Sequence, residues 1–307
     1  MAWYSLQRAS VDDGPHSKDD APLLNGRYRL GARLGDGASA RVHEAVDLRT
    51  GGLVAVKQIS LPANLSAAMR KEWVDRLRRE AQLARRLEHP DIVAIFEAGI
   101  GDGEAWLAME RVRGVDLGRY TQRHLLLPED LVLRITARVA AALAHAHGRG
   151  VVHRDLKPAN VLVNLASGQV KLADFGVARD PAADLTRTGM TLGTPAYMAP
   201  ELLAGAAASA ASDTYALGVL AFELLCGRRP HQASTLGELL RVSASQPPAS
   251  LARLRPELPA PVVVAVEALL ARKPADRPTD LAAWATQVAR LAALMTRLLA
   301  PASVPTL

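Results

Sequence analysis

The chain has 307 residues, 49% of them hydrophobic but only 4% aromatic, so we expect a large and mainly aliphatic core. Its net charge is +6, yet the arginines are scattered along the chain rather than gathered in blocks, which argues against a nucleic-acid-binding protein. A single cysteine, no signal-like apolar segment near the start and no run of about 18 apolar residues argue against a disulfide framework and a membrane span, and we expect a cytoplasmic protein.

The first part of the chain has the pattern of strands. Residues 1–25 are polar and rich in turn-forming residues, and we expect a flexible arm there. Apolar runs at 28–30, 41–46 and 53–59 are separated by glycines and predict strands joined by turns. A helix is expected from about 66 to 87, and two further short strands at 92–98 and 105–110.

Beyond Gly114 the pattern becomes helical. Apolar residues recur at spacings of three and four from Leu131 to Ala146, which predicts one face of an amphipathic helix that ends at Gly148. The stretch 214–226 is apolar on nearly every face, so it predicts a helix inside the core, with Cys226 buried at its end. A β-rich first part and a helical second part indicate an α+β protein of two lobes, with a ligand site between them.

One long polar string carries most of the chemistry. It is His153-Arg154-Asp155-Leu156-Lys157-Pro158-Ala159-Asn160, followed by Asp174-Phe175-Gly176. Asp155 is a candidate base and Lys157 a cation that can face a phosphate, while Asn160 and Asp174 can give oxygen ligands to a divalent metal. Transfer of the γ-phosphoryl group of ATP requires this set of groups.

The string resembles the catalytic and metal-binding loops of the protein kinases, and further kinase motifs occur in order from about Tyr28 to Arg290. The resemblance implies the bilobal kinase fold over 26–292, with a small β-rich N-lobe that contains one key helix (about 26–113) and a larger helical C-lobe (about 114–292). A flexible arm at 1–25 and a C-terminal tail at 293–307 would flank this domain.

The kinase type follows from a second motif. Lys157 together with Gly193-Thr194-Pro195 resembles the serine/threonine class in its bacterial, eukaryotic-like (Hanks-type) form. The resemblance implies a kinase that uses ATP with Mg²⁺, or with Mn²⁺, to phosphorylate Ser and Thr hydroxyls of proteins. Its implied partners are protein substrates and a second copy of itself, phosphorylated in trans through transient dimers, with neither nucleic acid nor a membrane span involved.

The nucleotide end combines weak and strong signals. Gly35 and Gly37 lie between two predicted strands, where an ordinary hairpin turn explains them about as well as a phosphate loop does, and Ala40 replaces the third glycine of the kinase form. Lys57 ends an apolar strand, and Glu80 lies on the inward stripe of the next helix, so we expect them to pair. The resemblance implies these nucleotide-binding residues: Leu34, Gly35, Gly37, Val42, Ala55, Lys57, Glu80, Met109, Glu110, Val112 and Leu162.

The resemblance also assigns roles to the catalytic groups. Asp155 would accept or orient the proton of the substrate hydroxyl, Lys157 would steady the γ-phosphate, and Thr194 would help to shape the acceptor site. Asn160 and Asp174 would bind the metal. Structural roles are implied for His153 and Phe175, which would stack in a hydrophobic column, for a buried Glu201–Arg277 ion pair, and for Asp213, which would accept N–H bonds from the catalytic loop.

The loop between Gly176 and Gly193 contains threonines, and threonines without any function are common in loops. The resemblance nevertheless implies that Thr186 and Thr188 are autophosphorylated and that Arg154 binds the phosphorylated loop. Thr191 fits less well.

Two other functions compete with this interpretation. A catalytically silent kinase fold that acts as a scaffold would be favoured by loss of Lys57, Asp155 or Asp174, and all three are present. A phosphotransferase for small molecules is disfavoured by the complete segment through Glu201 and by the pairing of Lys157 with Thr194.

Overall fold

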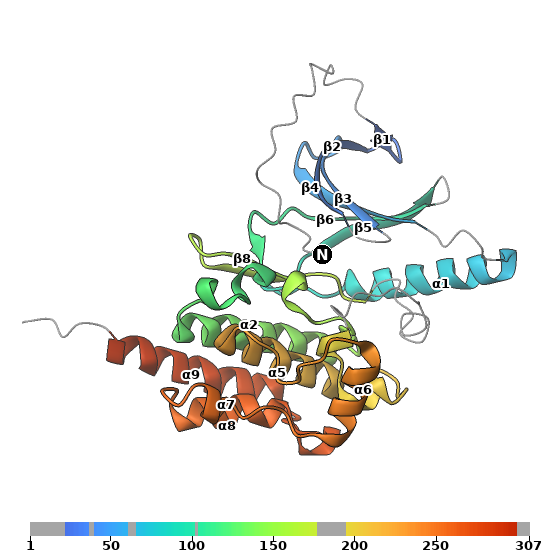
Figure 1. The fold of residues 1–307 in the computed structure, drawn as a ribbon. Coiled ribbons are helices and arrows are strands. Elements are labelled where there is room, and N and C mark those ends of the chain that lie inside the picture. The colour runs from blue at the N-terminus through green and yellow to red at the C-terminus, as the bar shows by residue number, and fades with distance from the viewer. Residues whose placement is uncertain (1–21, 37–39, 61–65, 102–103, 177–194, 300–307) are drawn as a thin grey trace, which may run out of the picture. The chain divides into compact units, whose positions relative to one another are not determined.

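The computed structural model describes residues 22–36, 40–60, 66–101, 104–176 and 195–299 (Figure 1). The chain forms two compact units: Met1–Gly118 with Ala159–Pro181, and Arg119–Pro158 with Ala182–Leu307. The first is rich in strands and the second in helices, which confirms the expected α+β class. The first unit includes the strands Val161–Asn164 and Gln169–Leu172, because they form a sheet with Val115–Asp116.

Within the described residues, two antiparallel sheets and one helix build the first unit. The larger sheet has the order β1-β2-β3-β4-β6-β5 and the smaller one the order β7-β8-β9. The strands are β1 (Leu23–Leu24), β2 (Tyr28–Asp36), β3 (Ala40–Asp47), β4 (Leu53–Ser60), β5 (Ile95–Gly101), β6 (Glu104–Glu110), β7 (Val115–Asp116), β8 (Val161–Asn164) and β9 (Gln169–Leu172). β1 lies within the stretch expected to be an arm, because Leu24 packs against the core cluster around Tyr28 and Trp106.

The strand expected at 92–98 begins later than predicted. Ile92 forms an isolated bridge with Leu172 of β9, and β5 starts only at Ile95. The segment before β5 therefore connects the two sheets of the first unit instead of extending the larger one.

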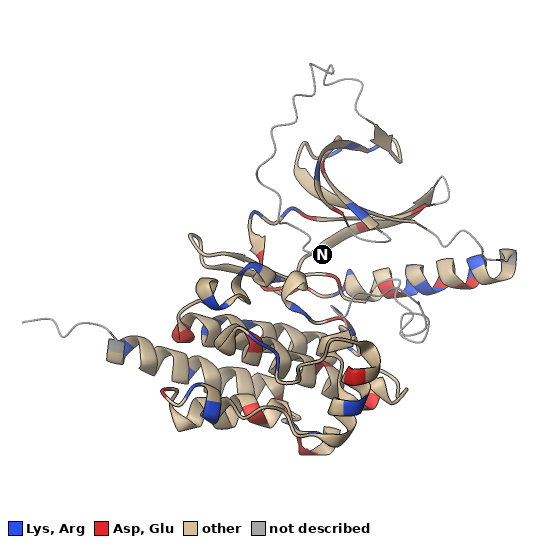
Figure 2. Cartoon of the chain, in the orientation of Figure 1, with Lys and Arg blue, Asp and Glu red and all other residues tan. Residues whose placement is uncertain are grey.

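Helix α1 (Ala67–Ala84) covers part of the larger sheet. Ser66 caps it by accepting the backbone N–H of Met69 at 3.3 Å. Leu77 and Ala81 pack in a cluster with Ile59 and Leu107 from the sheet. Ala40 belongs to the same cluster, so its methyl group contributes to the core where a glycine would leave a gap. Acidic and basic residues are interspersed along the exposed turns of α1 (Figure 2).

Gly99 offers a stability prediction within β5. A Cβ atom added there would overlap the indole ring of Trp106. Trp106 is buried and packs edge-to-face with Tyr28, with their ring centroids 5.5 Å apart. We expect Gly99→Ala to lower the free energy of unfolding by about 1–3 kcal/mol through overpacking. Gly101→Ala, on the same strand but with open space around its new methyl, should stay within about 0.5 kcal/mol of wild type. Denaturant titration measures both, and equal stabilities would contradict the packing argument.

The second unit is a helical assembly. Its helices are α2 (Glu129–His147), α4 (Pro200–Leu203), α5 (Ala210–Cys226), α6 (Leu236–Ser245), α7 (Leu251–Leu254), α8 (Ala260–Leu269) and α9 (Leu281–Leu299). Short 3₁₀ turns are η1 (Leu117–Tyr120), η2 (Arg123–Leu125), η3 (Pro158–Asn160), η4 (Pro195–Tyr197) and η5 (Pro274–Asp276), of which η1 and η3 straddle the boundary between the units. Figure 1 shows α2, α5 and α9 side by side, with α2 packing against both others. Helix α9 runs to Leu299 and so continues beyond 292, the expected end of the domain.

Helix α5 is the centre of this core. Every residue from Ser212 to Cys226 is buried, which confirms the prediction from its apolar sequence. Ser209 and Ser212 form a reciprocal capping box at its start, and Gly227 ends it in the left-handed region at φ 67°. Burial raises the pKa of the Cys226 thiol to about 11. Over the residues that the structure describes, no helix combines the length and the hydropathy that crossing a bilayer demands.

Candidate active site

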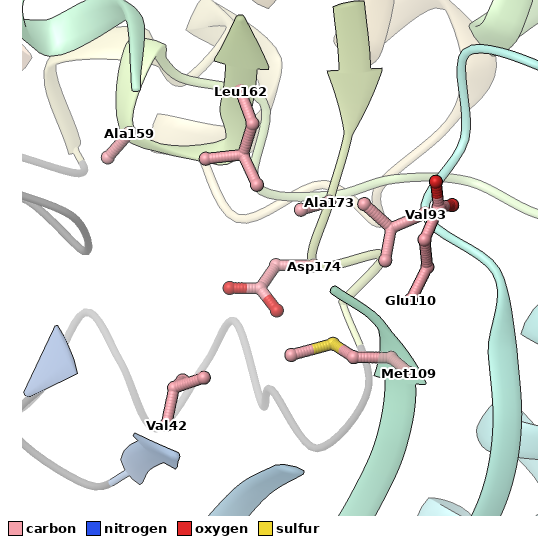
Figure 3. Close-up of a pocket in the computed structure, with 8 residues that line it drawn as sticks. All are labelled: Val42, Val93, Met109, Glu110, Ala159, Leu162, Ala173 and Asp174. Atoms are coloured by element: carbon pink, nitrogen blue, oxygen red, sulfur yellow. The ribbon is translucent and has the colours of Figure 1, made fainter. Parts of the chain in front are cut away.

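The first unit contains a mainly apolar pocket of about 350 Å³ (Figure 3). Its lining residues are Val42, Val93, Met109, Glu110, Ala159, Leu162, Ala173 and Asp174. In Figure 3 the Asp174 carboxylate points into the space between these side chains, whereas the Glu110 carboxylate points away from it. An apolar pocket with one inward carboxylate suits a flat organic group that carries a charged end.

Four of the predicted nucleotide-binding residues line this pocket, together with the predicted metal ligand Asp174. The four are Val42, Met109, Glu110 and Leu162. Gly35 pairs with Val42 across the β2–β3 ladder, and Val112 packs with Leu162 in a buried cluster. Leu34 on β2 and Ala55 in the core of β4 are not among the lining residues, and Gly37 lies outside the described residues.

Sequence reasoning missed three of the lining residues, Val93, Ala159 and Ala173. Ala159 and Ala173 lie inside or beside the polar string, so their position in the chain could have indicated them. Val93 had no such signal. It reaches the pocket because its backbone N–H donates to the carbonyl of Leu172 at 2.9 Å, which draws this segment against β9.

An ion pair joins β4 to the segment after β9. Lys57 Nζ lies 2.7 Å from Asp174 Oδ1, and the two side chains are only 12% and 17% exposed. Water screens so buried a pair weakly, so the ammonium is held firmly beside the pocket. Glu80 is half-buried on α1, on the same side of the helix as Leu77, and its pairing with Lys57 stays a prediction.

The backbone at Asp174 is strained. Its φ angle is 60°, in the left-handed region that costs a residue other than glycine about 1–2 kcal/mol. The preceding Ala173 is fixed, because its N–H donates to the Asn160 carbonyl at 2.8 Å. Strain held in this way is typical of functional sites, and it turns the Asp174 side chain into the pocket.

Asn160 and Asp174 could hold a divalent metal. Both offer the oxygen ligands that Mg²⁺ prefers, and the hydrogen bond from Ala173 to Asn160 brings their backbones together. Mg²⁺ is commonly bound by one or two such groups together with substrate phosphates, rather than by a cage made of protein alone. The oxygen donors of Asn160 and Asp174 therefore fit a site that Mg²⁺ would share with substrate phosphates. The described residues contain no cluster of three or more His, Cys, Asp or Glu.

In the second unit, Asp155 and Lys157 form a close pair. Lys157 Nζ donates to Asp155 Oδ2 at 2.9 Å, and the side chains are 17% and 9% exposed. A carboxylate oxygen can accept a hydrogen bond from a hydroxyl group. The pair therefore offers one group that can receive a proton and one that can face an anion.

Asp213 at the start of α5 holds the loop that carries this pair. Its Oδ2 accepts the His153 N–H at 2.7 Å and its Oδ1 accepts the Arg154 N–H at 2.9 Å. His147 Nε2 also lies 2.8 Å from Oδ2, a contact that sequence reasoning missed. Arg154 has a left-handed φ of 67° and an exposed side chain, so these bonds hold a strained turn in place.

His153 is built into this loop instead of facing solvent. It is fully buried, and its Nδ1 accepts the backbone N–H of Asp155 at 3.2 Å. Phe175 is buried within the first unit at 6% exposure.

Two further ion or hydrogen-bonded pairs hold the second unit around this loop. Arg277 donates to both carboxylate oxygens of Glu201, at 2.6 and 2.8 Å, and its side chain is 1% exposed. Tyr197 donates its hydroxyl to Glu223 Oε2 at 2.5 Å, and burial raises the pKa of both groups. Sequence reasoning missed this second pair. Thr186, Thr188 and Thr194 lie outside the described residues.

Comparisons with known proteins agree on one family. A family model described as the protein kinase domain matches residues 28–290. The chain is 38% identical over 260 residues to the serine/threonine-protein kinase PknA of Mycobacterium tuberculosis, covering 83% of this chain and 58% of that protein. It is 36% identical over 276 residues to the probable serine/threonine-protein kinase pknA2 of Bifidobacterium longum, covering 90% of this chain and 36% of that protein. The chain thus spans less than two thirds of the length of these relatives.

A solved structure supports the same family. The crystal structure of the PknI kinase domain of Mycobacterium tuberculosis superposes with a TM-score of 0.68 at 33% sequence identity. The match covers 87% of this chain and 97% of that domain.

Proposed function

The chain belongs to the Hanks-type serine/threonine protein kinase family, and from this membership we propose that it transfers the γ-phosphoryl group of ATP to serine and threonine hydroxyls of proteins. The observation that carries the proposal is the buried Lys57–Asp174 ion pair beside an apolar pocket. The pair places a cation for phosphates beside a metal ligand within the first unit, and Asp155 in the second unit is the proposed base.

The first unit would bind the nucleotide. Val42, Met109 and Leu162 give apolar walls to the adenine, and the backbone from Glu110 to Val112 meets its polar edge. Lys57 would orient the phosphates, and Asn160 and Asp174 would hold Mg²⁺. Bound there, the metal would supply positive charge that offsets the negative charge developing on the phosphate oxygens during transfer.

The second unit would supply the groups that act on the acceptor. Asp155 accepts a hydrogen bond from the substrate hydroxyl and takes up its proton as the new bond from oxygen to the γ-phosphorus forms, the bond from the γ-phosphorus to the β-phosphate oxygen breaks and ADP leaves. Lys157 steadies the transferred group with its ammonium, and Thr194 shapes the acceptor site. Asp213 keeps Asp155 in place by fixing the backbone of the two residues before it.

Lys57→Met tests the nucleotide role. The variant removes the ammonium and leaves Asp174 without its 2.7 Å partner, so we expect kcat/KM for ATP to fall about 100- to 1,000-fold. Steady-state assays with a generic protein acceptor and varied Mg-ATP measure it. Lys71→Met, the same change on the exposed face of α1, is the matched control and should keep the wild-type value. Equal kcat/KM in both variants would refute the assignment of Lys57.

Autophosphorylation is the regulatory part of the proposal. Thr186 and Thr188 are its proposed sites, and Arg154, whose side chain is exposed beside the strained turn, would bind a phosphorylated loop residue. After incubation with Mg-ATP, mass spectrometry should find phosphate on Thr186 and Thr188 and none in an Asp155→Asn sample. An active enzyme with an unmodified loop would overturn this part alone.

The wider proposal concerns partners and setting. Protein substrates and a second copy of the chain are the proposed partners, the copies pairing transiently for phosphorylation in trans. The cofactors are ATP with Mg²⁺, or with Mn²⁺, which offers the same octahedral preference for oxygen ligands. The cytoplasm, where ATP is made available, is the proposed compartment.

A further inference from the structure

Lys171 on β9 is a buried cation for which the proposed mechanism has no role. It is 9% exposed and lies between Val170 and Leu172, which are both buried. A buried ammonium is costly unless it is paired and hydrogen-bonded. Its Nζ lies 2.7 Å from Glu110 Oε2 and 3.4 Å from the carbonyl oxygen of Ile92. Lys171 therefore connects β9 to the end of β6 and to the segment before β5.

Glu110, the partner of Lys171, lines the pocket. Its Oε2 also accepts the backbone N–H of Ala94 at 3.3 Å, and its own backbone N–H donates to the Ala94 carbonyl at 2.8 Å. The carboxylate points away from the pocket space in Figure 3, so it is engaged in holding the wall and does not face a ligand. One carboxylate thus joins three segments of the first unit behind the pocket.

On the β9 side of the Lys171–Glu110 pair, Asp174 follows Lys171 by three residues in the chain. Leu172 exchanges backbone hydrogen bonds with Asp91 and Val93 at 2.8 and 2.9 Å, and Ala173 donates to Asn160. A slip of β9 by one residue would move Asp174 by about 3.3 Å along the strand direction. The Lys171–Glu110 pair opposes such a slip, since it ties a fixed position of β9 to a fixed position of β6.

Glu110 begins the segment 110–113, which two other side chains also hold. Arg111 pairs with Glu44 of β3 at 2.9 Å, and Asn164 of β8 donates to the Arg113 carbonyl at 2.8 Å. Lys171 is the most buried of the three anchoring side chains. Three anchors from three strands hold four consecutive residues, and only the one from β9 leads directly to Asp174.

We propose that Lys171 is a positioning residue for the nucleotide. Through its buried pair with Glu110, Lys171 fixes the segment 110–113 at the pocket relative to β9, the strand that Asp174 follows. The inference rests on the proposed function, in which the first of these elements meets the adenine and the second holds Mg²⁺. Without the pair, the segment 110–113 that meets the adenine and the Asp174 carboxylate that holds Mg²⁺ could shift independently. ATP would then bind in a less precise orientation.

Lys171→Met tests this role, because methionine keeps the volume and removes the charge. We expect the KM for ATP to rise roughly ten- to hundredfold, with the KM for the protein acceptor unchanged. The direct affinity for Mg-ADP, measured by calorimetry, should fall in parallel. Arg41→Met is the matched control. It breaks an ion pair of 2.6 Å with Glu104, which lies on β6 like Glu110, but the arginine is 45% exposed, so the KM for ATP should stay at the wild-type value.

A double variant separates positioning from mere stability. In Lys171→Met/Glu110→Gln no buried charge lacks its partner, so the melting temperature should recover from the value of the single variant while the KM for ATP stays raised. This variant also gives the readout if the single variant does not fold. Recovery of both quantities, or a wild-type KM for ATP in folded Lys171→Met, would overturn the inference. A wild-type protein that transfers no phosphate would instead refute the proposed function, and the affinity for Mg-ADP would still report on Lys171.

Discussion

Asp155→Asn is expected to lower kcat for phosphate transfer about 100- to 10,000-fold while leaving the fold intact. The amide cannot take up the proton of the acceptor hydroxyl, and this is the contribution that general bases make to such reactions. The fold should survive because the amide oxygen of the variant can still accept a hydrogen bond from Lys157. In the wild-type protein Lys157 Nζ lies 2.9 Å from Asp155 Oδ2. Transfer of ³²P from labelled ATP to a generic protein substrate measures the loss.

A second Asp-to-Asn change controls for the loss of a carboxylate as such. Asp280 Oδ1 caps α9 by accepting the Ala283 N–H at 2.9 Å, and asparagine caps helices as well as aspartate does. Asp280→Asn should therefore transfer phosphate at the wild-type rate. If Asp155→Asn did so too, Asp155 would not be the base, and a scaffold role for the site would have to be considered again.

Arg277→Met should produce the largest loss of stability, about 3–5 kcal/mol in the free energy of unfolding. The arginine is 1% exposed and donates to Glu201 and to the carbonyls of Ala211, Ala271 and Arg272. Its removal leaves the Glu201 carboxylate and these carbonyls without their donor in a mostly buried place. Chemical denaturation followed by circular dichroism measures the change.

The matched control breaks an ion pair of the same unit in which only the arginine is exposed. Arg134 pairs with Asp130 one turn away on α2 at 2.7 Å, and its side chain is 51% exposed. The buried Asp130 keeps the Thr296 hydroxyl as a donor at 2.8 Å, so Arg134→Met should cost under about 1 kcal/mol. Arg277→Met/Glu201→Met should be less destabilised than Arg277→Met alone, because no buried charge is then left behind. Similar losses for Arg277→Met and Arg134→Met would show that burial does not set the strength of the Glu201 pair.

Local sequence patterns were enough to predict several helices and strands of the fold. Helix α5 was predictable because a stretch that is apolar on every face has no stable place outside a core, and its burial from Ser212 to Cys226 follows. The strand β4 was predictable for a similar reason, since its run from Leu53 to Val56 is apolar; Lys57 does not end it, because β4 continues to Ser60. The Glu201–Arg277 pair came from the family resemblance, and the structure contains it.

Contacts between segments distant in sequence were not predictable in this way. Lys171 and Glu223 are single charged residues inside apolar stretches, and a sequence pattern treats each as an exception without naming its partner. Their partners, Glu110 and Tyr197, are known only once β9 is placed beside β6 and η4 beside α5. The start of β5 was mispredicted for the same reason, because Ile92 bonds to β9 instead of continuing the larger sheet.

The most direct test of the central claim is to incubate the wild-type protein with Mg²⁺, [γ-³²P]ATP and a generic protein substrate, and then to identify the labelled amino acids. The account predicts label on phosphoserine and phosphothreonine, dependent on Mg²⁺ or Mn²⁺. Label on phosphotyrosine would contradict the acceptor class, and no transfer to any protein would contradict the proposed activity itself.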